Sequence, residues 1–367
     1  MPPCLDISPP SLCADLAEAP GFLASFLADV PPAQVLIVTG PSSWHRSGAS
    51  AWFATHCSGH GPLFDDFSPN PQELDLLRGI DLFRAHSIRA VIAVGGGSAI
   101  DMAKLIAFFA PNHYTLDDFL AAAIPPSACS APVLAIPTTA GTGAEATHFS
   151  VLYRDHKKYS VAHPAIRPSH VWLAPAFTTS LPPYQTACTG MDALAQGIES
   201  FWAKGATPQS RAYALEAIPL ALAHLRSAVL APTPDDRAAM LRAAHLAGQA
   251  IDLSKTTAPH AFSYILTSTY HLPHGHAVAL LLPHFIDYHA AHGVTVPGIT
   301  GDAIRALMAD IRLPSTLPAA PAELADLLLS HVNLGRLSNN PLPVPSALVS
   351  SVARALTCPP STLTANA

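Results

Sequence analysis

The sequence predicts an α/β unit with a doubly wound parallel sheet at residues 1–180, followed by an all-helical unit at residues 181–367. The chain has 367 residues, of which 50% are hydrophobic, so it is long and apolar enough for two domains. Short apolar runs alternate with helical segments in the first half, which is typical of a parallel sheet. After about Pro182 the strand pattern stops and helical spacing continues. We expect the active site in the cleft between the two units.

Three apolar runs are interpreted as buried parallel strands, because each is short and leads into glycine or into small, hydroxyl-bearing residues. They begin at Val35, Ala90 and Pro132. Between and after them the spacing of apolar residues predicts helices. The helical ranges are 42–56, a segment that includes 81–86, a helix after the glycines at 95–97, and then 211–225, 236–251 and 321–331.

Composition narrows the class of protein. The formal net charge of -6 argues against a nucleic-acid partner. The 6 cysteines include no CxxC pair, which favours reduced thiols in a cytoplasmic protein over a disulfide framework. The N-terminal part of the sequence has no basic region followed by an apolar run, so we expect no signal peptide. The apolar stretch 217–230 is interpreted as too short to span a bilayer, so we expect no membrane partner.

The second strand leads directly into a glycine loop, Gly95-Gly-Gly-Ser, at the start of a helix. Gly95, Gly96 and Gly97 would let backbone N–H groups approach a pyrophosphate, and the helix start adds partial positive charge. A tight turn that binds nothing is the alternative for this loop alone. The next strand also ends in a small, hydroxyl-rich loop. Its candidate cofactor residues are Thr138, Thr139 and Thr142, and two such loops at the carboxyl ends of strands favour dinucleotide binding.

Asp192, His260 and His274 form a candidate metal site. Asp192 begins an apolar helical pattern, and each histidine follows a proline within apolar sequence. One carboxylate and two imidazoles suit Zn²⁺ or Fe²⁺. Gln196 follows Asp192 by four residues and projects from the same helix face. The chain has 19 histidines, so any one of them is more simply a core or surface residue, and these are distinguished only as a set.

Four motifs together resemble the iron-containing (group III) alcohol dehydrogenase family and follow the family's order along residues 30–350. They are Gly95-Gly-Gly-Ser-Ala-Ile-Asp, Pro137-Thr-Thr-Ala-Gly-Thr-Gly-Ala-Glu, Thr189-Gly-Met-Asp-Ala-Leu and Pro273-His-Gly. The resemblance implies a Rossmann-like cofactor domain and a helical domain in a dehydroquinate synthase-like arrangement. It also implies a divalent metal, Fe²⁺ or Zn²⁺, at Asp192, His260 and His274, and it adds Ser98 and Asp101 to the cofactor site.

The sequence departs from the family pattern at two active-site positions. Gln196 stands where the family usually has its fourth metal ligand, a histidine. An amide oxygen is a weaker ligand, and a site of three ligands keeps an open position for catalysis, although loss of the metal is the alternative. Tyr264 stands where many members have another active-site histidine. We therefore expect Tyr264, His276 or solvent to supply the proton.

A third departure concerns the cofactor. Many members end the first strand with an aspartate that meets the adenosine ribose, and here that position is Gly40. Loss of the carboxylate removes repulsion against a 2′-phosphate, which Ser42, Ser43 or Arg46 would then bind. The sequence therefore favours tolerance of NADPH, without excluding NADH.

Lys255 indicates the substrate. It lies in a segment that is usually glycine-rich in the family, just before the metal-binding His260, and is followed by Thr256 and Thr257. A buried lysine is costly unless paired, so an anionic substrate is a suitable partner; exposure to solvent or pairing with Asp252 is the alternative. Lys158 adds a cation where the family often has a lysine near the nicotinamide ribose. Together these features resemble the phosphonoacetaldehyde reductases of the family.

The sequence thus predicts a metal-dependent NAD(P)H oxidoreductase that reduces a small anionic aldehyde. The best candidate is phosphonoacetaldehyde, reduced to 2-hydroxyethylphosphonate in phosphonate biosynthesis, with Lys255, Thr256 and Thr257 binding the anion. We also expect a homodimer. A family dehydrogenase acting on a neutral short-chain alcohol or polyol is one alternative. A metal-free lyase or synthase of the dehydroquinate synthase-like fold is another, and a binding protein that has lost its metal is a third.

Overall fold

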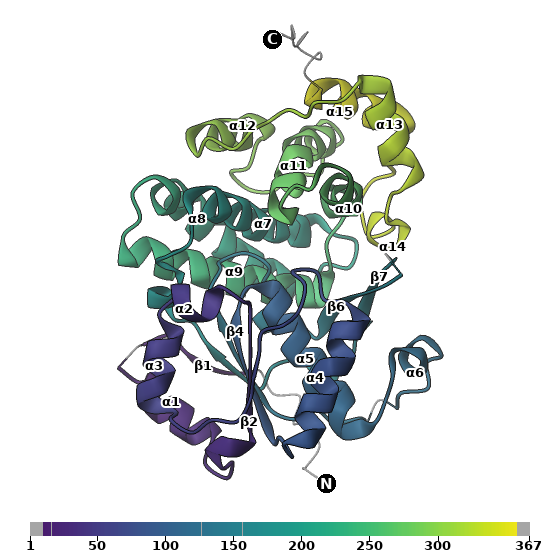
Figure 1. Cartoon of the computed structure of the whole chain (residues 1–367). Coiled ribbons are helices and arrows are strands. Elements are labelled where there is room, and N and C mark those ends of the chain that lie inside the picture. Colours follow the sequence, from purple (N-terminus) through teal and green to yellow (C-terminus); the bar gives the residue numbers. More distant parts are fainter. Residues whose placement is uncertain (1–9, 16, 126, 156, 358–367) are drawn as a thin grey trace, which may run out of the picture.

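A six-stranded parallel sheet forms the centre of the first half (Figure 1). The computed structural model describes residues 10–15, 17–125, 127–155 and 157–357. The strand order is β1-β8-β5-β4-β2-β3, and each neighbouring pair is parallel. The strands are β1 (Ser11–Cys13), β2 (Val35–Thr39), β3 (Leu63–Phe64), β4 (Ala90–Gly95), β5 (Val133–Pro137) and β8 (His170–Trp172).

Helices cover both faces of this sheet. Alternate residues of β4 point to opposite sides, so Val91 and Ala93 pack into one hydrophobic cluster while Ile92 and Val94 pack into another. The first cluster includes residues of α4 and α5, and the second includes residues of α1 and α3. The helices of this half are α1 (Ala19–Phe26), α2 (Ser43–Arg46), α3 (Ala49–His56), α4 (Glu73–Ala85), α5 (Gly97–Asn112) and α6 (Leu116–Leu120). The predicted doubly wound sheet is confirmed.

Some elements of this half were not expected. The predicted helix at 42–56 is two helices, because Gly48 between them has φ +83°. The strands β1, β3 and β8 have only two or three residues each, too few to show a periodicity. An antiparallel hairpin, β6 (Phe149–Arg154) and β7 (Lys157–Ala162), stands apart from the main sheet.

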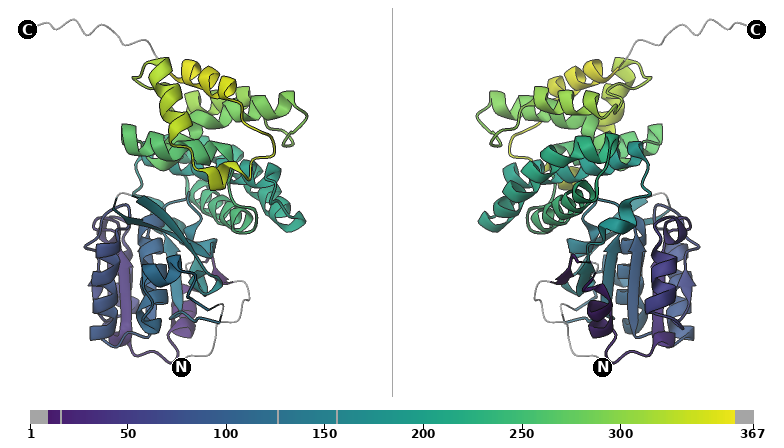
Figure 2. Two further views of the ribbon diagram at one scale, coloured as in Figure 1. Left: turned by 90° about the vertical axis from the view of Figure 1, so that its right-hand side faces the viewer. Right: turned by 90° about the vertical axis from the view of Figure 1, so that its left-hand side faces the viewer.

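The second half is built of helices stacked on the end of the α/β half (Figure 2). They are α7 (Pro183–Trp202), α8 (Pro208–Leu230), α9 (Pro234–Ser254), α10 (Ala258–Tyr270), α11 (His274–Ala291), α12 (Gly301–Asp310), α13 (Pro321–Ser330), α14 (Leu334–Leu337) and α15 (Ser346–Leu356). Helix α7 is buried along most of its length and packs against α8, α9 and α11. The last strand ends at Trp172 and α7 begins at Pro183. The division into two domains at residue 180 stays a prediction.

Helix α8 extends beyond the predicted helix at 211–225 at both ends, and a capping box at Thr207 begins it at Pro208. Within the described residues it is the single helix long and apolar enough to cross a membrane, by length and composition. The expectation that this stretch is too short was therefore wrong. The helix packs along α7 and α9, and core helices of globular proteins pass the same test.

A close backbone contact joins the two halves near the cleft. A Cβ on Gly143 would lie 2.5 Å from the Cα of Gly248 in α9, and Gly143 has φ +62°. Both conditions favour glycine at Gly143. Lys104 of α5 then holds the segment after Gly143, since its buried ammonium donates to the carbonyl oxygens of Ala144 and Phe149 at 2.9 and 2.7 Å. The segment from Gly143 to Phe149 is thereby fixed against both α5 and α9.

Candidate active site

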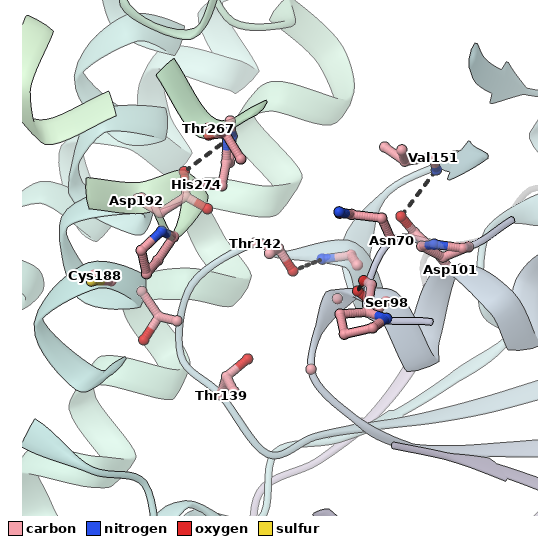
Figure 3. Close-up of a pocket in the computed structure, with 18 of the residues that line it drawn as sticks. Asn70, Ser98, Asp101, Thr139, Thr142, Val151, Cys188, Asp192, Thr267 and His274 are labelled. Atoms are coloured by element: carbon pink, nitrogen blue, oxygen red, sulfur yellow. Dashed lines mark hydrogen bonds and ion pairs between the residues drawn. The ribbon is translucent and has the colours of Figure 1, made fainter. Parts of the chain in front are cut away.

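A cavity of about 880 Å³ lies between the carboxyl ends of β2, β4 and β5 and the helices α7, α10, α11 and α14 (Figure 3). It collects most of the predicted site residues. Those in its lining are Gly40, Ser42, Gly96, Gly97, Ser98, Asp101, Thr139, Thr142, Lys158, Asp192, Gln196, Thr256, His260, Tyr264 and His274. The predicted residues outside its lining are Ser43, Arg46, Gly95, Thr138, Lys255, Thr257 and His276.

Three of the predicted metal ligands converge at one end of the cavity. One ligand atom from each of Asp192, His260 and His274 lies within 4.8 Å of the others. The Nε2 atoms of His260 and His274 are 3.3 and 3.9 Å from Asp192 Oδ1. That oxygen is buried and accepts no hydrogen bond from the described residues. A buried carboxylate oxygen facing two imidazole nitrogens is a suitable cage for a divalent metal.

Burial sets the charge of the third ligand. Burial lowers the pKa of His274 to about 3, and the positive charges of Lys158 and Arg336 act in the same direction. Burial would raise the pKa of Asp192, but the His274 and His260 rings outweigh it and lower that pKa. A neutral imidazole and an ionised carboxylate are the forms that bind metal.

Glu199, which was not among the predicted site residues, orients His260. Its Oε1 accepts a short hydrogen bond from His260 Nδ1, which directs Nε2 toward Asp192. Its Oε2 accepts hydrogen bonds from the Thr257 N–H and hydroxyl at 2.6 and 2.8 Å. Carboxylates that fix a ligand histidine in this way commonly support metal sites. Burial would lower the pKa of His260, but the charges of Glu199 and Asp192 oppose it and raise that pKa, so a metal has to displace a proton from Nε2.

The assignment of Thr257 to the substrate is corrected by this geometry. The Thr257 hydroxyl donates to Glu199 and accepts from Trp202 Nε1 at 2.9 Å, so its one donor is used within the protein, behind the predicted metal ligands. Glu199 follows Asp192 by seven residues and Gln196 by three. That spacing puts all three side chains on one face of α7 and would have revealed Glu199 in the sequence.

Gln196 lies where a fourth ligand would be expected. Its Nε2 donates to the Thr142 carbonyl oxygen at 3.3 Å. Its Oε1 is buried and has no hydrogen-bond partner among the described residues. The amide oxygen is therefore free to meet a metal or a bound ligand, since a buried acceptor left unpaired is costly.

Helix α11 approaches α7 closely at Gly275, directly after His274. A Cβ at Gly275 would lie 1.9 Å from the Cys188 carbonyl oxygen and 2.9 Å from Asp192 Cβ. No side chain fits in that space. The absence of a side chain at Gly275 thus sets the distance between His274 and Asp192.

The three glycines of the cofactor loop have different surroundings. A Cβ at Gly95 would meet Ala99 Cβ at 2.7 Å, and one at Gly97 would meet the Thr142 side chain at 2.8 Å, so these two allow close packing. A Cβ at Gly96 would meet only the Thr139 side chain, at 3.4 Å and beyond. Gly96 precedes α5 and lines the cavity, so its surroundings suit a phosphate at the helix N-terminus.

Several predicted cofactor residues are used within the protein. Ser43 donates to the Gly40 carbonyl oxygen at 3.0 Å, and Thr138 is buried, so neither lines the cavity. Ser98 donates to the Pro69 carbonyl oxygen. Asp101 accepts from the Val151 N–H at 3.0 Å and thereby attaches β6 to α5 (Figure 3). At this edge Gly40 and Ser42 lie in the lining.

The structure does not support the predicted roles of Lys255 and His276. Lys255 is exposed outside the cavity, and its φ of +62° at the end of α9 explains why glycine is expected there. His276 lies two residues after His274 on α11, so it points to another face. Its ring nitrogens bond to the Tyr184 hydroxyl at 2.8 Å and the Pro314 carbonyl oxygen at 2.7 Å.

Tyr264, Lys158 and Arg336 line the cavity beside the metal ligands. The Tyr264 ring stacks on His274, with ring centroids 5.6 Å apart. Lys158 Nζ lies 3.8 Å from the centre of the Tyr264 ring. Burial would raise the pKa of Tyr264, but the charges of Lys158 and Arg336 outweigh it and lower that pKa. Arg336 was not predicted, because a single arginine in a short polar segment carries no sequence signal.

Comparison with known proteins matches both halves of the chain to one family. The pattern described as iron-containing alcohol dehydrogenase matches residues 18–175. The pattern described as the C-terminal part of the Fe-containing alcohol dehydrogenase family matches residues 186–333. The two matches cover most of the described chain.

Individual relatives agree with this. A phosphonoacetaldehyde reductase of Streptomyces viridochromogenes is 38% identical over 259 residues, which are 66% of this chain and 65% of that protein, slightly under two thirds. An NAD-dependent methanol dehydrogenase of Bacillus methanolicus is 32% identical over 70% of this chain and 69% of its own length. The crystal structure of a sulfoacetaldehyde reductase from Bifidobacterium kashiwanohense with NAD⁺ has a TM-score of 0.85 at 30% identity, covering 96% of this chain and 98% of that one.

We predict that Gly275→Ala weakens metal binding by at least about tenfold, which is within the usual effect of disturbing a ligand's surroundings. The new methyl group has to displace α11 from α7 and so moves His274 away from Asp192. Affinity is measured by titrating Zn²⁺ against a competing chelator, with Gly21→Ala as the control because a Cβ at Gly21 has nothing within 4 Å. Unchanged affinity in a folded Gly275→Ala protein would show that this contact does not set the site.

Proposed function

The chain belongs to the iron-containing alcohol dehydrogenase family, and we propose that it is a metal-dependent NAD(P)H oxidoreductase that reduces a small anionic aldehyde to a primary alcohol. One observation carries the proposal. The unpaired Asp192 Oδ1, between two imidazole nitrogens, opens into the same cavity as the cofactor loop at Gly96. A metal and a nicotinamide bound there would meet at one carbonyl group.

The substrate proposed within this class is phosphonoacetaldehyde, with 2-hydroxyethylphosphonate as its product. Two relatives are named as reductases of two-carbon aldehydes that carry an anion, a phosphonate in one and a sulfonate in the other. Other relatives in the family are named for neutral alcohols, such as methanol and 1,3-propanediol. The positive charges of Lys158 and Arg336 in the cavity favour the anionic class.

Different residues of the cavity would bind the metal, orient its ligands and donate the proton. When bound, a divalent metal supplies Lewis acidity to the carbonyl oxygen and the nicotinamide supplies the hydride. Asp192, His260 and His274 would hold the metal, and Glu199 keeps His260 Nε2 directed at it. The Tyr264 hydroxyl replaces His276 as our proposed proton donor, since it lies in the cavity. Each turnover consumes one aldehyde, one NAD(P)H and one proton, and yields one alcohol and one NAD(P)⁺.

Oxidation of NAD(P)H against a small aldehyde panel tests the function. We expect kcat/KM for phosphonoacetaldehyde to exceed that for propanal, a neutral aldehyde of similar size, by at least about tenfold, the value of one charge-assisted hydrogen bond. Chelation should abolish turnover, and Fe²⁺ or Zn²⁺ should restore it.

The same panel can contradict the substrate class and the reaction class separately. Equal efficiency on propanal would remove the anionic substrate class and leave a neutral-alcohol dehydrogenase. Turnover without net NAD(P)H oxidation would indicate a lyase or synthase.

We predict that the protein uses NADPH at least as well as NADH, because Gly40 offers no carboxylate to a 2′-phosphate. Gly40→Asp should weaken NADPH binding relative to NADH by at least about tenfold, since two like charges a few ångströms apart repel strongly. The added Cβ meets only the Ser43 hydroxyl at 2.9 Å and its Cβ at 3.9 Å, and the hydroxyl can rotate away.

Gly40→Asn is the matched control, because it adds the same bulk without the charge. Fluorescence titration with both cofactors measures the effect. A wild-type protein that rejects NADPH, or equal behaviour of the Asp and Asn variants, would contradict the role given to Gly40.

A further inference from the structure

One arginine in the cavity lining has hydrogen-bonding capacity that the protein does not use. Arg336 lies on the short helix α14 and lines the cavity. Its Nη1 is buried and has no hydrogen-bond partner among the described residues. A guanidinium donor that is shielded from water and left unpaired costs folding free energy, unless a ligand accepts a hydrogen bond from it.

The other contacts of Arg336 hold it without neutralising it. Its guanidinium carbon lies 5.6 Å from the centre of the Phe149 ring, which supports one face of the group. Across the described part of the chain, no carboxylate lies within ion-pair distance of it. Lys158, the other cation of the lining, lies over the Tyr264 ring. Arg336 Nη1 is therefore a buried cationic donor of the lining that remains open to a ligand.

Two hydrogen bonds to backbone carbonyl oxygens fix α14 beside the predicted metal ligands. The Asn333 N–H, at the start of α14, donates to the carbonyl oxygen of Ala261, the residue after His260, at 3.1 Å. Asn339, just after α14, donates through Nδ2 to the Thr256 carbonyl oxygen at 3.0 Å. The Thr256 hydroxyl is also buried, lines the cavity and has no partner among the described residues. Arg336 and Thr256 thus offer unused donors on segments tied to each other and to α10.

We propose that Arg336, with the Thr256 hydroxyl as a second donor, binds the anionic group of the substrate and so determines the preference for an aldehyde bearing a tetrahedral oxyanion. The assignment rests on the proposed function and gives Arg336 the role that the sequence suggested for Lys255. A planar guanidinium suits two oxygens of a phosphonate or sulfonate at once. The family match ends at residue 333, before Arg336, so this position is outside the part of the chain matched to the family.

Kinetics on matched substrates test the assignment, with the metal-loaded protein. For Arg336→Met we expect the ratio of kcat/KM on phosphonoacetaldehyde to kcat/KM on propanal to fall by at least about tenfold, mainly through a higher KM for the anionic substrate. Arg336→Lys keeps the charge but not the paired donors, so it should fall between wild type and Arg336→Met. Arg354→Met, which changes an exposed arginine of α15, is the control and should keep the wild-type ratio.

A binding measurement provides a readout that does not depend on turnover. Ethylphosphonate carries the anion but no carbonyl group, and calorimetry gives its affinity for the same proteins. We expect at least about tenfold weaker binding to Arg336→Met and wild-type affinity in Arg354→Met. An unchanged substrate ratio with unchanged ethylphosphonate affinity would overturn the assignment, as would equal losses on both aldehydes, which indicate a structural role. A wild-type protein with no preference for the anionic aldehyde would instead overturn the proposed substrate class itself.

Discussion

The site depends on one buried helix face that carries two carboxylates around one imidazole. Asp192 and Glu199 of α7 lie at opposite nitrogens of His260. The Nδ1 atom bonds to Glu199, so the ring has one orientation and its Nε2 faces Asp192. Gln196 lies between them on the same face. Helix α11 then brings His274 to Asp192, at a separation that only glycine at position 275 permits. The remaining parts of the cavity are arranged around this fixed centre.

The α/β half contributes to the cavity the loops that follow β2, β4 and β5. A few contacts fix the position of these loops relative to α7. The Gly143–Gly248 contact lets the loop after β5 meet α9, and Lys104 and Asp101 attach the following strand to α5. Gly96 and the predicted metal ligands therefore line one cavity, to which both halves contribute. Hydride transfer needs such an arrangement, because cofactor and polarised carbonyl have to be held close together with water excluded.

Much of this could be predicted from the sequence, because its signals are local. Buried strands and helices have distinct periodicities, and Asp192, His260 and His274 stand in recognisable motifs. Arg336 could not be found, since its importance arises from which segments fold beside it. The exposure of Lys255 could not be predicted, because composition shows that a cation is present but not that it lies outside the cavity. Glu199 was overlooked although its seven-residue spacing from Asp192 was readable in the sequence.

We propose that Asp192, His260 and His274 bind a single catalytic metal, on which turnover depends. The most direct measurement is the metal content of wild-type and His274→Ala protein after chelation, reloading with Fe²⁺ or Zn²⁺ and dialysis, together with NAD(P)H oxidation by the same samples. We expect one metal per chain and full turnover for wild type, with metal retention and turnover lost together in His274→Ala. Full activity in metal-free protein, or metal retained with full activity in the variant, would contradict it.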